Sequence, residues 1–287
     1  MSLRGKTAIV GFGEIPTERN YPGRTTESLC TEVARIAIED AGLRKSDIDG
    51  LITREENNPL DVAQHMGIHP VFAQGMTLHG ASGAASVMVA ASAIYAGLAT
   101  NVLCVLGATR DPEVGGAQPG APRVPPPVSY HTEWEDPYGP VIAANGHYAL
   151  LKRRHMHEFG TTDEQFAKIA VDERFNALLN PNAVWRGVPQ TLEDVLKSRY
   201  VAEPLHLLEC VMPCAGAGAV IVTSAERAKA MPNPPVYILG AGGAATNRSA
   251  TWQAPEMTTT PVVMSAPRAF QMSRYSPKDM QFAEFYD

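Results

Sequence analysis

Charged residues are absent from one long part of the sequence. No Asp, Glu, Lys or Arg occurs between Asp61 and Arg110, although these four residue types make up 19% of the 287-residue chain. An uncharged segment in a chain of ordinary charge content indicates elements that are buried on more than one face. We therefore expect residues 72–108 to form the centre of the core.

Several classes of protein are excluded by what else is scarce. The formal net charge is -6, which leaves no basic surface for nucleic acid or an anionic membrane as the main partner. The first residues lack the apolar segment of a signal peptide, and the most hydrophobic predicted helix, residues 82–99, is too rich in Ala, Ser and Gly to span a bilayer. A cytoplasmic protein with a small-molecule or protein partner is expected.

Cysteine is also scarce. The chain has four, Cys30, Cys104, Cys210 and Cys214. Their spacing matches no metal site, and their density is too low for a disulfide scaffold. The histidines show no metal-ligand spacing either, so we expect reduced thiols and no bound metal.

Strand and helix signals alternate in the first part of the chain. Strands are expected at residues 7–14, after residue 50, at 71–78 and at 101–107, with helices at 26–41, 58–66 and after the turn at 79–83. This order predicts an α/β sheet with parallel pairing and helices on both faces. The helix that follows the turn is apolar all round, which predicts that it lies inside the protein.

The middle of the chain breaks this pattern. Residues 111–140 include eight prolines, and a loop of this length is either functional, as an interaction surface, or an exposed excursion. Helices are expected at residues 141–159, 164–179 and 192–198. Strand signals return at 217–223 and 235–242.

The last part of the chain repeats the first. YILGAGGA at 237–244 resembles AIVGFGE at 8–14, and APRAFQMSRYSPKDMQFAEFYD at 266–287 resembles ARIAIEDAGLRKSDIDGLIT at 34–53. Both copies read as strand, loop, helix, polar turn and strand, which predicts a duplicated α/β fold. The second copy stops at Asp287, where it would expose a sheet edge, so we expect the folded gene product to extend further.

Five segments together resemble the thiolase superfamily, in its sterol-carrier-protein and lipid-transfer-protein branch. They are AIVGFGEIP, HGASGAASVMVAASAI, HEFGTTDEQFAKIAVDERFNALLNPNA, AEPLHLLECVMPCAGAGAVIV and SPKDMQFAEFYD. The resemblance implies a duplicated thiolase fold of αβαβα layers whose second half is truncated here. The first half would comprise residues 1–110 and 215–230. Residues 111–214 would be an insertion that covers the active site, and residues 231–287 would be the start of the second half.

The resemblance also implies partners and a substrate. Members of the family act on acyl-CoA thioesters, so coenzyme A would enter as part of the substrate and no further cofactor would be needed. A homodimer built on the first half is implied as well. The related aldolases work with a small OB-fold, zinc-ribbon protein, and the proline-rich loop is a candidate contact surface for such a partner.

The sequence departs from the family where a thiolase carries its nucleophile. The family's Cys-Ser-x-Gly turn reads Gly80-Ala81-Ser82-Gly83 here, so Gly80 takes the place of the cysteine that attacks the thioester. The other cysteines belong to other segments. Cys214 could lie near the site or be a packed thiol.

A second departure lies at the end of the chain. Tyr286 and Asp287 stand where thiolases carry Asn-Glu or His-Asp, and a tyrosine at this place resembles the thiolase-like aldolases of steroid side-chain breakdown. Such enzymes cleave a β-hydroxyacyl-CoA by a retro-aldol step and need an acid/base group and N–H donors for the enolate, but no thiol.

The resulting hypothesis assigns a role to each residue. Tyr286 would be the acid/base, Asp287 would orient it, and the turn of His79, Gly80 and Ala81 would hold the thioester oxygen. The structural alternatives are a core tyrosine, a solvated carboxylate and a packing histidine. Two other functions stay open: an acyltransferase that recruits another thiol, and a non-catalytic acyl-CoA-binding or scaffold subunit.

Overall fold

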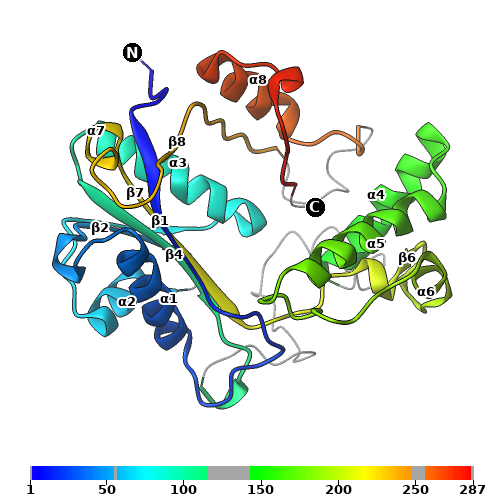
Figure 1. Ribbon diagram of the computed structural model, residues 1–287. Coiled ribbons are helices and arrows are strands. Elements are labelled where there is room, and N and C mark those ends of the chain that lie inside the picture. The colour runs from blue at the N-terminus through cyan, green and yellow to red at the C-terminus, as the bar shows by residue number, and fades with distance from the viewer. Residues whose placement is uncertain (1, 55–56, 115–142, 247–255, 286–287) are drawn as a thin grey trace, which may run out of the picture. The chain divides into compact units, whose positions relative to one another are not determined.

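The computed structural model describes residues 2–54, 57–114, 143–246 and 256–285 (Figure 1). The chain forms two compact units. The first draws on the ranges Met1–Gln118, Cys214–Ala244 and Val262–Asp287, and the second on Pro119–Pro213 and Ala245–Pro261.

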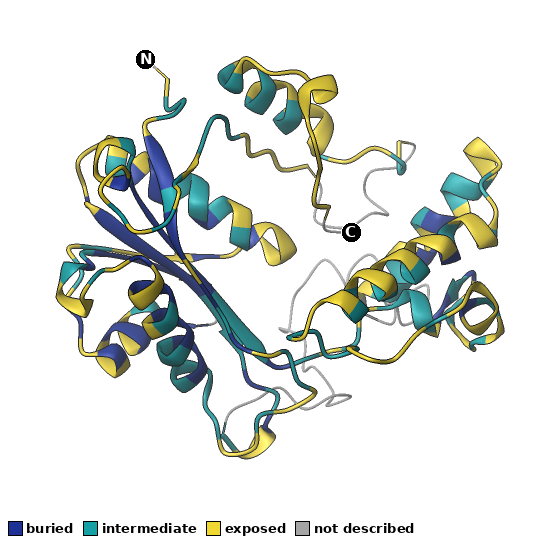
Figure 2. Ribbon diagram, in the orientation of Figure 1, coloured by how far each residue is buried: buried dark blue, intermediate teal, exposed yellow. Residues whose placement is uncertain are grey.

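A six-stranded sheet forms the centre of the first unit. In spatial order its strands are β3 (Phe72–Met76), β2 (Gly50–Arg54), β4 (Asn101–Ala108), β7 (Gly216–Ser224), β1 (Thr7–Glu14) and β8 (Val236–Tyr237). Apolar and β-branched residues fill β2, β4 and the second half of β7, and Figure 2 shows these strands as the most deeply buried part of the unit.

The sheet combines parallel and antiparallel pairing. β2 pairs in parallel with β3 and β4, as the alternation of strands and helices predicts. β7 lies outside the alternating segment on which that prediction rests, and it pairs antiparallel with both β4 and β1. The reason is that Ala108 pairs with Gly216, so the chain leaves the sheet and re-enters it at the same end, and two strands joined in that way run in opposite directions.

Two helices cover one face of the sheet. α1 (Thr26–Asp40) and α2 (Pro59–Met66) pack together in one apolar cluster with β1, β4 and β7. Leu29, Val33 and Ala37 recur at helical spacing along α1 and are all fully buried, which is the pattern of an amphipathic helix on a sheet.

The opposite face carries α3 (Ser82–Tyr95). Residues such as Ala90 are buried against the sheet, but Tyr95 on the other side is 43% exposed. The prediction that α3 is enclosed on all sides is therefore wrong for the described residues. The reason is that a sheet contacts one face of a helix only. Away from the sheet, Gly243 approaches Met88 of α3: a Cβ at position 243 would lie 3.3 Å from the Met88 Cε. The small, uncharged side chains of α3 fit a partly exposed face as well as a buried one.

The two copies of the predicted repeat share one packing feature, a glycine that lies against a helix backbone. A Cβ at Gly13 of β1 would collide with the carbonyl oxygen of Val33 on α1. In the later copy, a Cβ at Gly242 would collide in the same way with the carbonyl oxygen of Ser265 on α8 (Val262–Ser273). Each glycine lets a helix backbone approach an extended segment closely.

The second unit consists mainly of helices. These are α4 (Ala143–Phe159), α5 (Asp163–Leu179) and α6 (Leu192–Lys197), with a two-stranded ribbon of β5 (Tyr200–Ala202) and β6 (Leu205–His206). At its centre, the Lys152 ammonium forms ion pairs with Glu209 at 2.8 Å and Asp163 at 2.7 Å. None of the helices in the described part of the chain combines the length and the apolar character that crossing a bilayer requires.

Candidate active site

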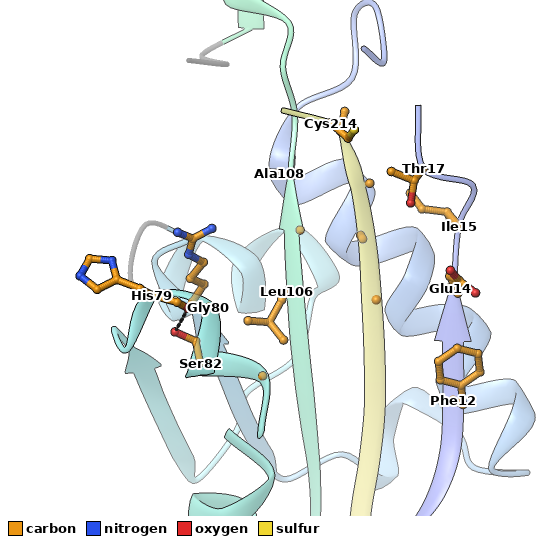
Figure 3. A pocket seen from close by; sticks show the side chains of 17 residues that line it. Phe12, Glu14, Ile15, Thr17, His79, Gly80, Ser82, Leu106, Ala108 and Cys214 are labelled. Atoms are coloured by element: carbon orange, nitrogen blue, oxygen red, sulfur yellow. Dashed lines mark hydrogen bonds between the residues drawn. The ribbon is translucent and has the colours of Figure 1, made fainter. Parts of the chain in front are cut away.

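A cavity of about 610 Å³ opens in the first unit where the turn before α3 meets the ends of four strands (Figure 3). The end of β1 contributes Phe12 and Glu14, the end of β2 contributes Arg54, and the end of β4 contributes Leu106 with the two residues that follow. The remaining lining residues belong to the turn and the start of α3, to the loop after β1, and to the entry into β7. They are His79, Gly80, Ser82, Gly83, Ile15, Thr17 and residues 214–218.

The turn that leads into α3 is held in place by Ser82. Its hydroxyl donates to the carbonyl of His79 at 2.8 Å and accepts from the backbone N–H of Leu78 at 3.0 Å, and its side chain is buried. His79 adopts a left-handed backbone with φ of +49°, which is uncommon for a residue other than glycine. A buried hydroxyl thus fixes a strained turn beside the cavity.

The beginning of α3 favours a negative charge beside the cavity. Ala81 stands at the N-cap position and no side chain caps the helix there. The N–H groups of Ala81 and Ser82 donate to the carbonyls of Leu78 and His79 within the turn, and the helix dipole favours negative charge at this end. The position next to Gly80 can therefore stabilise a developing oxyanion.

The structure brings together three of the six predicted site residues. His79, Gly80 and Cys214 line the same cavity, and Figure 3 shows His79 and Gly80 on one side with Cys214 beyond Leu106. Ala81 belongs to the same turn but is not among the lining residues. Tyr286 and Asp287 lie outside the described residues.

The thiols in the described part of the chain are not set up as nucleophiles. Burial raises the pKa of Cys30 and of Cys104 to about 12. Burial also raises the pKa of Cys214 above the usual cysteine value, against the opposing effect of Arg110 and Arg19. Since the thiolate is the attacking form, each of these residues is a neutral thiol at pH 7.

Sequence reasoning missed two charged residues of the cavity. Glu14 and Arg54 each close a buried strand, β1 and β2, and both line the cavity. A single charged residue that ends an otherwise apolar strand could have identified both, because ligands of α/β sheets bind near the strand ends. Among the described residues, no group of three or more His, Cys, Asp or Glu side chains could hold a metal ion.

Next to the cavity, a buried polar pair supports the end of β4. The Asn57 side-chain amide donates to the carbonyl of Gly107 at 2.8 Å, and the Thr53 hydroxyl donates to the carbonyl of Asn57 at 2.5 Å. Both side chains are buried. Their hydrogen bonds fix the strand end that forms part of the cavity floor.

Comparison with protein-family models gave no match. The chain is 34% identical over 99% of its length to a steroid side-chain-cleaving aldolase of Thermomonospora curvata, of which it covers 75%. It is 32% identical, again over 99% of its length, to the 17-hydroxy-3-oxo-4-pregnene-20-carboxyl-CoA lyase of Mycobacterium tuberculosis, of which it covers 76%.

Two solved structures have similar folds. The Ltp2-ChsH2(DUF35) aldolase matches with a TM-score of 0.85 at 32% identity, over 96% of this chain and 72% of that one. A monomeric SCP2-thiolase like protein of Mycobacterium smegmatis matches with a TM-score of 0.74 at 20% identity, over 96% of this chain and 58% of that one. The second likeness concerns the fold alone.

Proposed function

The chain belongs to the thiolase superfamily, in its sterol-carrier-protein-like branch that includes steroid side-chain aldolases, and we propose that it is a carbon-carbon lyase that cleaves a β-hydroxyacyl-CoA. One observation carries the proposal. Glycine occupies position 80, at the start of α3 and in the wall of the cavity, where a thiolase holds its attacking cysteine. The binding apparatus for a thioester is retained, but its nucleophile is not.

The proposed reaction is a retro-aldol cleavage. A base removes the proton of the β-hydroxyl group, the bond between the α- and β-carbons breaks, and the β-carbon becomes a ketone. The electron pair passes to the thioester as an enolate, which then takes up a proton at the α-carbon to give a shortened acyl-CoA. Atoms and electrons balance without a covalent enzyme intermediate, so no cysteine is required.

Each site residue has a role in this proposal. Tyr286 is the acid/base group and Asp287 orients it. The N–H group at Gly80 stabilises the enolate oxygen, since that of Ala81 already donates to the carbonyl of Leu78 at 3.0 Å, and His79 donates a hydrogen bond to the thioester or to a water molecule. Coenzyme A enters as part of the substrate, and no other cofactor takes part.

We also propose two protein partners. The similar aldolase structure is described as a complex with a DUF35 protein, which supports a small OB-fold, zinc-ribbon partner for this chain. A second copy of the chain would form a homodimer through the first predicted half. The four cysteines are reduced thiols, which suits a reducing compartment and supports a cytoplasmic location.

The direct test is to mix the purified chain and the candidate partner with a β-hydroxyacyl-CoA that carries a tertiary alcohol. We expect equal amounts of ketone and shortened acyl-CoA, measured by liquid chromatography with mass spectrometry. Acyl-CoA binding without turnover in every combination of partners would instead identify a binding or scaffold subunit.

A second candidate function rests on Cys214. Because this thiol lines the same cavity as Gly80, it could accept an acyl group in a transferase reaction. An acylated Cys214 trapped after rapid quenching, and detected by peptide mass spectrometry, would favour the transferase. An unmodified thiol under conditions of full turnover would exclude it.

Alkylation of Cys214 provides a further prediction. Its pKa is raised by burial, so the reactive thiolate is rarer than in a free cysteine, and the rate with iodoacetamide should keep increasing at pH values above the usual cysteine pKa. Acyl-CoA at ten times its dissociation constant should slow the reaction roughly tenfold, because it leaves about one site in eleven empty. Cys210, whose pKa is also raised by burial but which does not line the cavity, is the matched control. Equal rates at Cys214 with and without acyl-CoA would contradict its place in the substrate site.

A further inference from the structure

Gly218 occupies the middle of the cavity floor. It pairs with Leu106 of β4 on one side and with Glu14 of β1 on the other, and all three residues line the cavity. Directly paired residues of neighbouring strands point to the same face of a sheet. Gly218 is therefore the place in this row of the floor where no side chain rises toward the cavity.

The fold does not require glycine at this position. Its backbone is not in the left-handed region, and a Cβ would have no heavy atom closer than 3.9 Å, the carbonyl oxygen of Gly13. Gly13 itself differs, because a Cβ there would collide with the backbone of α1. A glycine within a strand destabilises it relative to alanine, so at position 218 the sequence gives up stability without a packing reason.

Gly216 extends the same bare surface. It lies two residues before Gly218, so it shares its face of β7, and its partner on β4 is Ala108. A Cβ at Gly216 would lie 3.5 Å from the Thr17 hydroxyl, an ordinary contact. Two positions on the same face of β7, 216 and 218, thus leave peptide backbone facing the cavity that the turn at Gly80 also lines.

Charged residues stand at the two ends of the row. Glu14 lies on β1, at one end. On β2, Thr53 is the last residue paired with β4, where it lies opposite Val105, and Arg54 follows it at the other end of the row. Three strand spacings separate β1 from β2, so the two backbones are roughly 14 Å apart. A straight acyl chain would contact only a small part of a floor this wide, whereas a flat ring system would cover it.

We propose that Gly218 determines the acyl group that the enzyme accepts, by leaving the β7 backbone free for a broad, fused-ring acyl group bound beside the thioester site. This inference rests on the proposed function, since it names the residue that determines which acyl groups the same cavity accepts. The thioester lies at Gly80, and the rings lie over Gly218 between the two charged ends of the row.

The test compares Gly218→Ala and Gly218→Val with the natural chain on two β-hydroxyacyl-CoA substrates. One carries a fused-ring tertiary alcohol, and the other is 3-hydroxy-3-methylbutyryl-CoA, which would give acetone. The valine variant should lower the ratio of kcat/KM for the fused-ring substrate to that for the small one by at least ~30-fold, because added methyl groups in a pocket discriminate on this scale. Alanine should have a smaller effect in the same direction. An unchanged ratio for both variants would overturn the proposal.

A binding measurement separates this inference from the lyase proposal. Dissociation constants of fused-ring and short acyl-CoA analogues that lack the hydroxyl group need no turnover, and Gly218→Val should weaken binding of the fused-ring analogue selectively. If neither the natural chain nor the variants turned over any substrate, but Gly218→Val still weakened binding of the fused-ring analogue selectively, the lyase proposal alone would fail. Equal weakening of both analogues would defeat the inference.

Folding controls complete the design. Gly218→Ala should have a thermal midpoint equal to or above that of the natural chain, since the change removes freedom from the unfolded state only. Gly13→Ala should lower the midpoint, because the added Cβ strikes the backbone of α1. If Gly218→Ala lowered the midpoint as much as Gly13→Ala does, the glycine would have a structural role and the proposal would fail.

Discussion

Replacement of Tyr286 with phenylalanine is expected to lower the turnover of a β-hydroxyacyl-CoA by on the order of 10³-fold, the usual scale for loss of a positioned acid/base group. The phenol oxygen is the only atom removed, so the ring can still occupy its place. Tyr286 lies outside the described residues, and its role rests on the resemblance to aldolases that lack the thiolase cysteine. Stopped-time assays of ketone release, at substrate concentrations well above KM, measure the effect on kcat.

The control for this substitution is Tyr275→Phe. Tyr275 belongs to the same late part of the chain, is 45% exposed and does not line the cavity. Its replacement should change turnover by less than about twofold, as expected for a surface position. Affinity for an acyl-CoA analogue should be similar in the natural chain and in Tyr286→Phe, because an acid/base group acts in the transition state. Equal turnover of Tyr286→Phe and the natural chain would remove this tyrosine from the mechanism.

The role proposed for Tyr286 follows from the absence of a thiol at position 80. A thiolase needs a thiolate at the start of the buried helix, and here that position has no side chain at all. Cys214, which lines the cavity, has a raised pKa, so it is a poor replacement. Retro-aldol cleavage needs only a base and a site for the enolate, and we propose that the turn at Gly80, before α3, supplies the second of these.

Much of the fold was predictable from the sequence, and the thiolase-like α/β fold is confirmed by the similar aldolase structure. Alternating apolar segments predict β2, β3 and β4 and their parallel pairing. The antiparallel entry of β7 was not predictable, because it depends on where the chain returns after more than a hundred residues. Pattern rules for crossovers apply to short connections.

The candidate site was predictable where it lies in one segment. The turn of His79 and Gly80 could be read from the sequence, because turn and helix are neighbours in the chain. The floor could not, since Leu106, Gly218 and Glu14 meet only through the register of three strands. Register depends on which faces are buried across the whole sheet, and a single segment does not contain that information.

The second unit depends on one buried charge cluster. The Lys152 side chain is 4% exposed and that of Glu209 is 7% exposed, and Lys152 also donates to the carbonyl of Pro204 at 2.9 Å. Its ammonium lies 5.2 Å from the centre of the Phe166 ring. Asp163, at the start of α5, is its other carboxylate partner. One cation therefore joins α4, α5 and the segment after β6.

Lys152→Ala is expected to destabilise this unit by about 3–5 kcal/mol, because it leaves the carboxylate of Glu209 buried without its partner. Urea unfolding followed by tryptophan fluorescence measures the loss, since Trp185 lies in the same unit. The double variant Lys152→Met/Glu209→Gln removes both charges at similar volume and should recover most of it. Lys168→Ala, which breaks an exposed ion pair with Asp172, should cost less than about 1 kcal/mol. If Lys152→Ala were no more destabilising than Lys168→Ala, the cluster would not be what holds the helices of this unit together.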